Sequence, residues 1–270
     1  MPLTLSVAII TKNEEANLAR TLASVRWADE IVIVDSGSAD RTEEIARSFE
    51  AKFFVEPWKG FGVQKNSAIA KCTCDWVLSL DADEEVSPEL AEDIRRQCID
   101  VEDRRSPQHV GFEIARRNLF LGRWIRYGGF YPDRKLRLVL RGSSRFAERE
   151  VHETMQLPVS QSAAFSSSVG RLRGDLIHHA YPTLEGYIEH MNRYSTLGAE
   201  LAMKRGPGST SAFGFLWNVL LNPAATFVYN YVFRVGFLDG REGLLLHLYH
   251  SAYVSWKYAK AWQLSARKRS

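Results

Sequence analysis

The chain has 270 residues, which is enough for one large domain or for one domain with an appendage. Hydrophobic residues make up 45% of it, so a sizeable core can form, and a formal net charge of only +3 argues against binding to nucleic acid through overall charge. The three cysteines have neither an even count nor a metal-binding spacing, which argues against a disulfide framework and favours free thiols in a reducing cytosol.

The first hundred residues alternate between strand and helix patterns, and the N-terminus turns polar too early for a signal peptide. Strands are expected at Leu5–Ile10, Glu30–Asp35, Lys52–Val55 and Asp75–Leu80, and helices at Glu15–Val25, Thr42–Phe49, Val63–Lys71 and Pro88 to about Cys98. Ser87, Pro88 and Glu89 open the last helix as an N-cap, a proline at the first helical position and an acid in the first turn. Alternation of this kind predicts an α/β fold with a mainly parallel sheet flanked by helices.

The second hundred residues follow a different pattern. Strands are expected at Gly111–Ala115 and Lys135–Leu140, a loop of small residues at Ser160–Gly170, and a long helix at Leu184–Lys204. From Arg116 to Arg149, ten Lys and Arg residues stand against only two acids, Asp133 and Glu148. This excess fits either an anionic partner or a solvated arginine-rich face.

An uncharged stretch, Ala212–Phe233, is long enough to span a bilayer. Pro223 interrupts it, however, and asparagine recurs at positions 218, 222 and 230. We therefore expect interfacial helices, or a helix packed on the rest of the chain, rather than a membrane span. The basic tail Ala266–Ser270 suits anionic lipid. The segment predicts a cytoplasmic protein attached peripherally to the inner face of the cell membrane.

Polar clusters follow three of the predicted strands, at Thr11–Glu14, Asp35–Asp40 and Asp81–Glu84. Ligands of an open parallel sheet bind outside the carboxyl ends of its strands, so we expect the three clusters along one edge. The sequence contains neither the glycine motif of a dinucleotide-binding fold nor a P-loop.

The acids after the fourth strand raise a question of charge. Asp81, Asp83, Glu84 and Glu85 have no basic residue near them in sequence, and like charges this close repel. Carboxylates in an Asp-x-Asp pattern suit a hard divalent cation, Mn²⁺ or Mg²⁺, which recruits substrate phosphates. We therefore expect a metal, bound together with a diphosphate, to supply the missing positive charge.

Four motifs resemble the family 2 glycosyltransferases, which have the GT-A fold: AIITKNEE, IVIVDSGSADRT, GFGVQKNSAI and LSLDADE. They cover about the first hundred residues, in the family's order and spacing. A later stretch, RRNLFLGRWIRYGGFYPD followed by KLRLV and VHE, resembles a bacterial branch that includes glucosyltransferases of the lipopolysaccharide inner core. The resemblance implies a nucleotide-sugar-binding part at residues 1–104, an acceptor-binding part at 105–205 and a membrane-associating helical segment at 206–270.

The resemblance also implies roles for single residues. Asp35 would accept a hydrogen bond from a uracil ring, Lys65 would meet the diphosphate, and Asp83 would hold the metal, Mn²⁺ or Mg²⁺. The full set for the nucleotide sugar is Thr11, Asn13, Glu14, Asp35, Ser38, Lys65 and Asp81. Arginines suit phosphates and aromatic faces suit sugar rings, so the acceptor would meet Arg116, Trp124, Arg126, Tyr131 and Arg137. The structural alternatives are core packing for Trp124 and a solvent-exposed position for Lys65.

A transfer with inversion also needs a carboxylate that takes the proton from the acceptor hydroxyl. Glu153 is our candidate, and His152 would orient it or bind phosphate. Other candidates for the base are Glu148, Glu150 and Asp133, and His178 and His179 are either a further ligand or structural side chains.

The expected function is transfer of a hexose, with glucose as first choice, from a UDP-sugar to a hydroxyl of a lipopolysaccharide core or a related cell-envelope glycolipid. A polyprenyl phosphate is an alternative acceptor. Two other classes stay open. A phosphatase of the haloacid dehalogenase type also begins with a strand followed by Asp-x-Asp, but it leaves the Thr11–Glu14 and Asp35–Asp40 clusters without a role. A membrane-docked carbohydrate-binding scaffold leaves the acids of all three clusters unexplained.

Overall fold

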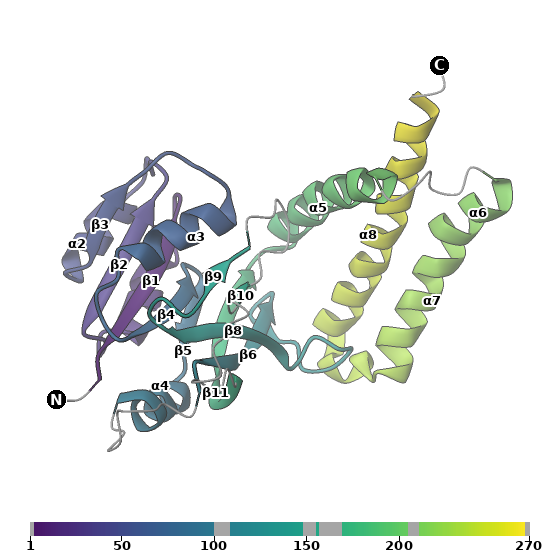
Figure 1. Ribbon diagram of the computed structural model, residues 1–270. Helices are drawn as coiled ribbons and strands as arrows, with labels where there is room; N and C mark the ends of the chain where they lie inside the picture. Colours follow the sequence, from purple (N-terminus) through teal and green to yellow (C-terminus); the bar gives the residue numbers. More distant parts are fainter. Residues whose placement is uncertain (1–2, 100–108, 148–154, 157–168, 205–210, 268–270) are drawn as a thin grey trace, which may run out of the picture. The chain divides into compact units, whose positions relative to one another are not determined.

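The structure is a computed structural model that describes residues 3–99, 109–147, 155–156, 169–204 and 211–267 (Figure 1). The chain divides into two compact units. The first comprises Met1–Arg116 and Asp133–His178, and the second comprises Arg117–Pro132 and His179–Ser270. The functional segments 1–104, 105–205 and 206–270 describe what each part binds rather than how it packs, and they stay a prediction.

Four parallel strands form one half of the sheet in the first unit, in the order β3-β2-β1-β4. They are β1 (Leu5–Thr11), β2 (Glu30–Asp35), β3 (Lys52–Val55) and β4 (Trp76–Asp81). The strands β1, β2 and β4 are buried along almost their whole length, because helices cover both faces of the sheet. This half agrees with the alternation predicted from the sequence to within one residue at each strand end.

The helices of the first unit cover the two faces of the parallel half (Figure 1). Leu22, Ala46 and Leu90 of three helices join one core cluster, and Ala68 of a fourth helix joins the other. The first three helices are α1 (Leu18–Ser24), α2 (Thr42–Ser48) and α4 (Pro88–Ile94), which continues as η1 (Arg95–Ile99), and the fourth is α3 (Phe61–Ala70).

Helix α1 starts later than predicted, and α4 starts where predicted. The backbone N–H groups of Asn17 and Leu18 both donate to the carbonyl of Glu14, at 3.0 and 2.9 Å, so a turn occupies the predicted first residues of α1. Ser87 caps α4 by accepting a hydrogen bond from the N–H of Leu90 at 3.2 Å. The Ser87 side-chain cap could therefore be predicted from the sequence. The turn at Glu14–Asn17, which delays the start of α1, could not.

An antiparallel half extends the sheet beyond β4, in the order β8-β6-β11-β5. The sequence predicted parts of β6 and β8 but neither β5 nor β11, and it assigned the first two residues of β11 to a loop. The strands are β5 (Glu84–Val86), β6 (Gly111–Phe120), β8 (Asp133–Leu140) and β11 (Val169–Tyr181), with short strands β7 (Arg123–Trp124), β9 (Arg145–Phe146) and β10 (Met155–Gln156). Gly174 lets β11 pass the start of α4, because a Cβ there would lie 2.4 Å from the nitrogen of Leu90.

The second unit is mainly helical (Figure 1). Its helices are α5 (Leu184–Lys204), α6 (Ala212–Leu216), η2 (Trp217–Leu221), α7 (Asn222–Val228), η3 (Tyr229–Phe233), η4 (Gly236–Asp239) and α8 (Gly240–Arg267). The segments from α6 to η3 form one continuous helix, Ala212–Phe233, and this helix confirms the apolar helical segment predicted from the sequence. By length and composition this helix could cross a membrane. Only 6% of its 18-residue apolar stretch is buried in the protein.

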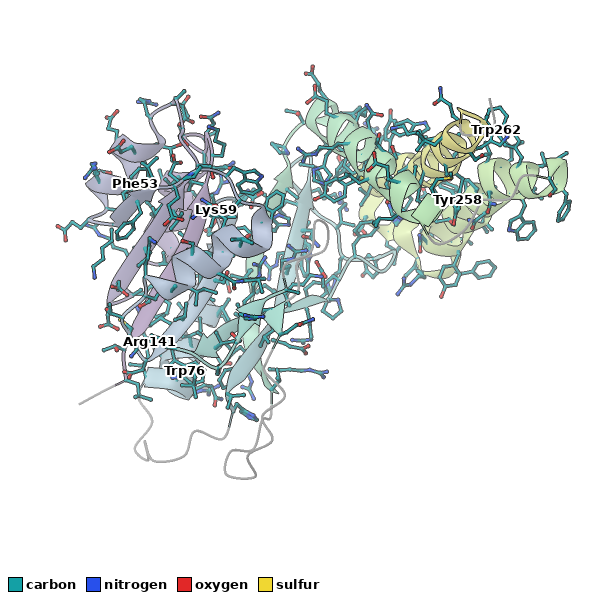
Figure 2. The ribbon with its side chains drawn as sticks, turned by 45° about the horizontal axis from the view of Figure 1, so that its top comes forward. Phe53, Lys59, Trp76, Arg141, Tyr258 and Trp262 are labelled. Carbon is teal, nitrogen blue, oxygen red and sulfur yellow. The ribbon has the colours of Figure 1, made fainter. Side chains whose placement is uncertain are left out.

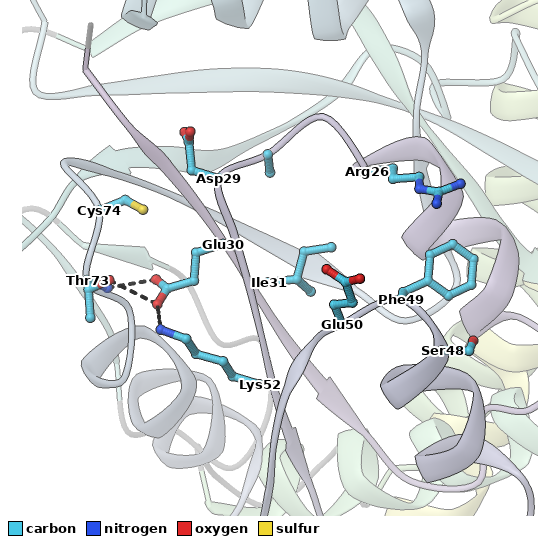
Figure 3. Close-up of a pocket in the computed structure, with 11 residues that line it drawn as sticks. Arg26, Asp29, Glu30, Ile31, Ser48, Phe49, Glu50, Lys52, Thr73 and Cys74 are labelled. Atoms are coloured by element: carbon cyan, nitrogen blue, oxygen red, sulfur yellow. Dashed lines mark hydrogen bonds and ion pairs between the residues drawn. The ribbon is translucent and has the colours of Figure 1, made fainter. Parts of the chain in front are cut away.

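A cavity of about 360 Å³ opens at the amino ends of β2 and β3, away from the carboxyl ends where the predicted site lies (Figure 3). Three of its polar lining residues, Glu30, Lys52 and Thr73, bind one another. Glu30 is 7% exposed, pairs with Lys52 at 2.5 Å, and accepts hydrogen bonds from Ser6 and from the backbone and hydroxyl of Thr73. Burial opposes ionisation of Glu30, but these bonds lower its pKa from 4.5 to about 2.

Glu30 should therefore stabilise the fold above pH 4.5 and lose this contribution as the pH falls toward 2. We expect the difference in unfolding free energy between the wild type and Glu30→Gln to shrink by about 1.4 kcal/mol per pH unit below pH 4.5. Urea unfolding at several pH values measures it. The control variant Glu43→Gln changes an exposed pair with Arg47, so it should shift stability by less than about 0.5 kcal/mol throughout. A difference for Glu30→Gln that does not change with pH would contradict this role.

Candidate active site

The three polar clusters lie along one edge of the sheet, as predicted. Strands β2, β1 and β4 are parallel neighbours, with Thr11 opposite Asp35 and Ile10 opposite Asp81. Each strand ends at this edge, so the side chains that follow it gather there. The edge carries most of the residues that the sequence singled out for the nucleotide sugar.

Asp35 organises the loop that follows β2. Its carboxylate accepts hydrogen bonds from the hydroxyl of Thr11 at 2.8 Å, from the N–H groups of Gly37 and Ser38 at 2.7 and 2.6 Å, and from the Ser38 hydroxyl. The Ser38 hydroxyl also accepts a bond from the N–H of Asn13, at 2.7 Å. Four predicted residues are thus brought together. Asp35 is only 1% exposed, so a uracil ring could reach it only if some of these bonds broke, and its contact with uracil stays a prediction.

Glu14 belongs to the same edge. Burial raises the pKa of Glu14 against the hydrogen bond from Asn17, and the negative charges of Asp83, Asp40 and Asp81 raise it further. The backbone N–H of Glu14 donates to the hydroxyl of Thr42 at 2.8 Å, which fixes the loop after β1 against the start of α2. The carboxylates of Glu14, Asp40, Asp81 and Asp83 are thus close enough at this edge of the sheet to repel one another.

Asp81 is neutralised by two cations from distant parts of the sequence. Lys65 of α3 lies 2.7 Å from one carboxylate oxygen, and Arg137 of β8 lies 2.5 Å from the other. Burial alone would raise the pKa of Asp81, but Arg137 and Lys65 hold it well below its usual range. Lys65 is 6% exposed, so the structure does not place it in open solvent.

Glu84 is fully buried and has cationic partners of its own. Arg137 lies 3.1 Å and Arg116 lies 3.5 Å from its carboxylate, which also accepts the N–H of Asp81 at 3.0 Å. The expectation that a metal supplies the positive charge is thus corrected for Asp81 and Glu84, since Lys65, Arg116 and Arg137 supply it. These three cations lie at least 16 residues from the acids along the chain, so the sequence around the acids does not predict the pairing.

Asp83 has a histidine as its neighbour. Strand β5 pairs with β11 so that His178 stands opposite Glu84, and the His178 Nε2 lies 3.4 Å from the Asp83 carboxylate. Burial lowers the pKa of His178, but the hydrogen bond and charge of Asp83 outweigh burial and raise it. The sequence could suggest His178 only as a possible ligand, because strand β11, which positions it, was not predicted.

The donor atoms at this position fit a divalent cation. A carboxylate and an imidazole are ligands that Mn²⁺ accepts, and the carboxylates of the edge add negative potential. The side chain of Asp83 keeps 29% of its surface exposed, so it can be reached from outside. Within the described ranges no group of three His, Cys, Asp or Glu side chains forms a complete metal site, so other ligands would come from substrate or water.

The residues predicted for the acceptor divide between the units. Arg116 and Arg137 belong to the first unit and bind carboxylates there. Arg137 is 5% exposed and lies between Asp81 and Glu84. This position makes it a positioning residue for Asp81, and contact with an acceptor stays a prediction.

Trp124, Arg126 and Tyr131 lie together in the second unit. The rings of Trp124 and Tyr131 meet edge to face with centroids 5.1 Å apart, and the guanidinium of Arg126 lies 5.4 Å from the Trp124 ring. Asp239, 3% exposed, holds this loop by accepting the N–H groups of Arg126 and Tyr127 at 3.1 and 2.8 Å. The aromatic and cationic character expected of a sugar-phosphate contact is thus held in one loop.

The candidates for the base fall mostly outside the described residues. Glu153 and His152 lie there, as do Glu148 and Glu150. Asp133 is described: burial would raise its pKa, but Arg116 at 2.5 Å and Lys135 at 3.0 Å lower it. A carboxylate with a lowered pKa is a weak proton acceptor, so the structure disfavours Asp133 as the base.

Comparison with known proteins places the chain in a family. Residues 6–138 match the model of glycosyl transferase family 2. The chain is 31% identical, over 98% of its length and 94% of the relative's, to the lipopolysaccharide core biosynthesis glycosyltransferase LpsC of Rhizobium meliloti. It is also 33% identical, over 75% of its length and 69% of the relative's, to an uncharacterized glycosyltransferase of Rickettsia typhi.

Two solved structures are also similar. TarS residues 1–349 of S. aureus in complex with UDP shares 16% identity over 99% of this chain and 92% of that chain, with a TM-score of 0.46. Glucosyl-3-phosphoglycerate synthase from Mycobacterium tuberculosis, in complex with Mn²⁺, UDP and its product, shares 22% identity over 44% of each chain, with a TM-score of 0.34. The family model, the full-length relative and the observed sheet together confirm the predicted α/β fold of GT-A type. The chain is a glycosyltransferase and belongs to glycosyltransferase family 2.

Proposed function

We propose that this enzyme transfers a hexose, with glucose as first choice, from a UDP-sugar to a hydroxyl of a lipopolysaccharide core or a related cell-envelope glycolipid, with inversion at the anomeric carbon. The observation that carries the donor half is the gathering of three polar clusters at one edge of a parallel sheet. The full-length relative, whose name gives lipopolysaccharide core biosynthesis, supports the acceptor half. Family membership also removes the phosphatase and the non-enzymatic scaffold as alternatives.

The edge would supply the contacts for the nucleoside and for the diphosphate. Thr11, Asn13, Asp35 and Ser38 form one hydrogen-bonded loop pair that would hold the nucleoside, with Glu14 behind it. Lys65, now paired with Asp81, would exchange part of this contact for a diphosphate oxygen, because a lysine ammonium has three donors. Asp81 would then face the ribose or the sugar.

Asp83 and His178 would hold the divalent cation, Mn²⁺ or Mg²⁺, if the family's use of such ions extends to this enzyme. The ion would stabilise negative charge on the departing nucleoside diphosphate. Two observations support a cation at Asp83. The Asp83 side chain is partly exposed, and the neighbouring Asp81 and Glu84 already have cationic side chains as partners. Structures of the M. tuberculosis synthase contain Mn²⁺ or Mg²⁺ together with UDP.

The acceptor hydroxyl must lose a proton as it attacks the anomeric carbon. Glu153 is our candidate for that base, with His152 beside it in the sequence to orient it. The loop that carries Trp124, Arg126 and Tyr131 would contact the acceptor's sugar and phosphate groups. We place the enzyme in the cytoplasm, on the inner face of the cell membrane, where a glycolipid acceptor is accessible.

A transfer assay tests this proposal. UDP-glucose, UDP-galactose and UDP-N-acetyl sugars are each incubated with the enzyme, Mn²⁺ and truncated lipopolysaccharide core. We expect release of UDP and a mass gain of one hexose on the core, fastest with UDP-glucose. A polyprenyl phosphate serves as the competing acceptor. A gain on the polyprenyl phosphate alone would overturn the assignment of the acceptor, and no gain with any UDP-sugar on either acceptor would overturn the assignment of the donor.

A further inference from the structure

The helix Ala212–Phe233 exposes one continuous apolar face. Its large apolar side chains on that face are between 43 and 75% exposed. They stand in two rows with a repeat of four residues: Phe213, Trp217, Leu221, Tyr229 and Phe233 with Ala225, and Leu216, Leu220, Val228 and Val232 with Ala224. We call these two rows the apolar stripe. No charged residue interrupts it.

The backbone is adapted to keep the stripe straight. An α-helix has 3.6 residues per turn, so a four-residue repeat would wind around its surface. The segments η2 and η3 are π-helical, and a π-helix has more residues per turn. These two wider segments bring rows of four residues back to one side of the helix.

The opposite side of the same helix is its polar side. Asn218, Asn222, Thr226 and Asn230 also repeat every four residues, and all four are only partly exposed. On this side the carbonyls of Pro223 and Val219 accept hydrogen bonds from the hydroxyls of Ser251 and Ser255 of α8, at 2.7 and 2.8 Å. The inner side thus combines this polar row with a row of less exposed apolar residues, Phe215, Val219, Pro223, Phe227 and Tyr231. The outer side is apolar throughout, which is the opposite of the polar outer face of a surface helix in water.

Helix α8 separates this helix from α5. Lys260 of α8 donates to the carbonyl and side chain of Asn192 and to Ser195 of α5, at 2.6 to 2.8 Å. Along α8, Ser251 and Ser255 stand about half a turn from Tyr253 and Lys257. The latter two lie against Gly198 of α5, because a Cβ there would be 3.7 Å from the Tyr253 hydroxyl and 3.1 Å from the Lys257 side chain. The two neighbours therefore pack on opposite sides of α8, with the apolar helix beside α8 in Figure 1.

The outer face of α5 is polar and charged. Its exposed side chains include Glu185, Glu189, Arg193, Thr196 and Glu200, which repeat every three to four residues. The three helices therefore form a layer with one charged face and one apolar face. A bilayer-spanning orientation would carry the charged face of α5 into hydrocarbon alongside α8, which is strongly unfavourable.

Further groups extend the apolar face and supply positive charge at its margin. Leu248 and Trp262 of α8 are 51 and 47% exposed, and Trp262, labelled in Figure 2, packs against Phe215. Arg234, which directly follows the last residue of the stripe, and Arg241, in the first turn of α8, are both exposed. Arginines at such a margin complement the anionic headgroups of a membrane surface.

We propose that the apolar stripe is a membrane-docking surface that lies flat in one leaflet of a bilayer containing anionic lipid, with the helix axis parallel to the membrane plane. At about 1.5 Å per residue the 22-residue helix would be long enough to cross the hydrocarbon core, so length does not decide the orientation. The charged face of α5 decides it, because a flat orientation keeps that face in water. The inference is independent of the sugar and the acceptor.

Vesicle binding tests the surface. The full chain is sedimented with vesicles of equal parts phosphatidylcholine and phosphatidylglycerol. The double variant Leu220→Glu/Leu221→Glu should lose roughly tenfold or more in partitioning, because it puts two charges in the stripe. The control Leu201→Glu changes an exposed leucine of α5 and should partition within about twofold of the wild type. Equal binding by the wild type and the double variant would overturn the proposal. So would a wild-type dimer that buries the apolar stripe between two copies of the chain and does not dissociate when vesicles are added.

Depth measurements test the orientation, even if the double variant does not fold. The native cysteines Cys72, Cys74 and Cys98 are buried, so a fluorescent label can be placed on a single new cysteine. Phe213→Cys and Phe233→Cys label the ends of the helix, and Leu221→Cys labels its middle. A flat helix predicts equal, shallow quenching by spin-labelled lipid at all three positions. Deep quenching at the middle with shallow quenching at both ends would show a spanning helix and overturn the proposal.

Discussion

Replacing Asp83 by asparagine is expected to lower hexose transfer by roughly 10²–10³-fold, with little change in stability. Asp83 follows the end of β4, and among the described residues its ion-pair partner is the His178 imidazole, 3.4 Å away. The neighbouring acids Asp81 and Glu84 are instead paired with arginine or lysine. The amide removes the negative charge but keeps the size of the side chain. The initial rate of UDP release at saturating UDP-sugar measures the effect.

Glu85→Gln is the matched control for Asp83→Asn. Glu85 belongs to the same acidic stretch, and its side chain is 31% exposed and points to Arg20 at 3.9 Å. A weak, partly exposed ion pair contributes little, so we expect this variant to keep its rate within about twofold. Equal losses in the two variants would mean that general negative charge, rather than Asp83 itself, matters for the reaction.

Replacing Arg137 by methionine is expected to destabilise the fold by about 3 kcal/mol. Arg137 is 5% exposed and bridges Asp81 at 2.5 Å and Glu84 at 3.1 Å. Methionine fills much of the same volume but leaves the buried Glu84 with one fewer cation, and an incompletely paired buried charge is costly. Urea unfolding at pH 7 measures the loss. Transfer should also fall, because Asp81 loses one of the two cations that position it.

Arg171→Met provides the comparison for Arg137→Met. Arg171 pairs with Glu113 at 3.4 Å, and its side chain is 71% exposed. The same substitution there should change the unfolding free energy by less than about 0.5 kcal/mol. If Arg137→Met were as mild as Arg171→Met, the network around Glu84 would not be the support for β4 and β5 that we describe.

The parallel half of the fold is readable from the sequence because its signals are local. A buried strand such as Ile31–Val34 is continuously apolar, and Ser87 announces α4 through its own side chain. The antiparallel strands β5 and β11 are not readable in this way. Strand β5 has three residues and two acids, and its partner β11 lies about ninety residues later, so only the tertiary pairing defines it.

The site was predictable at the level of the sheet edge but not at the level of charge. The acids of the site follow the ends of predicted strands, so their position at one edge of a parallel sheet could be predicted. The structure confirms this for Thr11, which stands opposite Asp35. Nothing local shows that Arg137 and Arg116 come back across the sheet to neutralise Asp81 and Glu84, so a reading of the acids alone assigns all the missing charge to a metal. Burial is equally invisible in the sequence: Asp35 is 1% exposed, and its carboxylate already accepts hydrogen bonds from the protein.

The most direct test of the central claim is calorimetric titration of UDP into the wild-type enzyme, with Mn²⁺ and after treatment with a chelator. A UDP-sugar transferase whose edge carboxylates hold a divalent ion should bind UDP with Mn²⁺ and at least about tenfold more weakly without it. Binding of ADP, GDP or CMP in place of UDP would contradict the proposed donor. No binding of any nucleoside diphosphate would contradict the assignment of this edge of the sheet as the donor site.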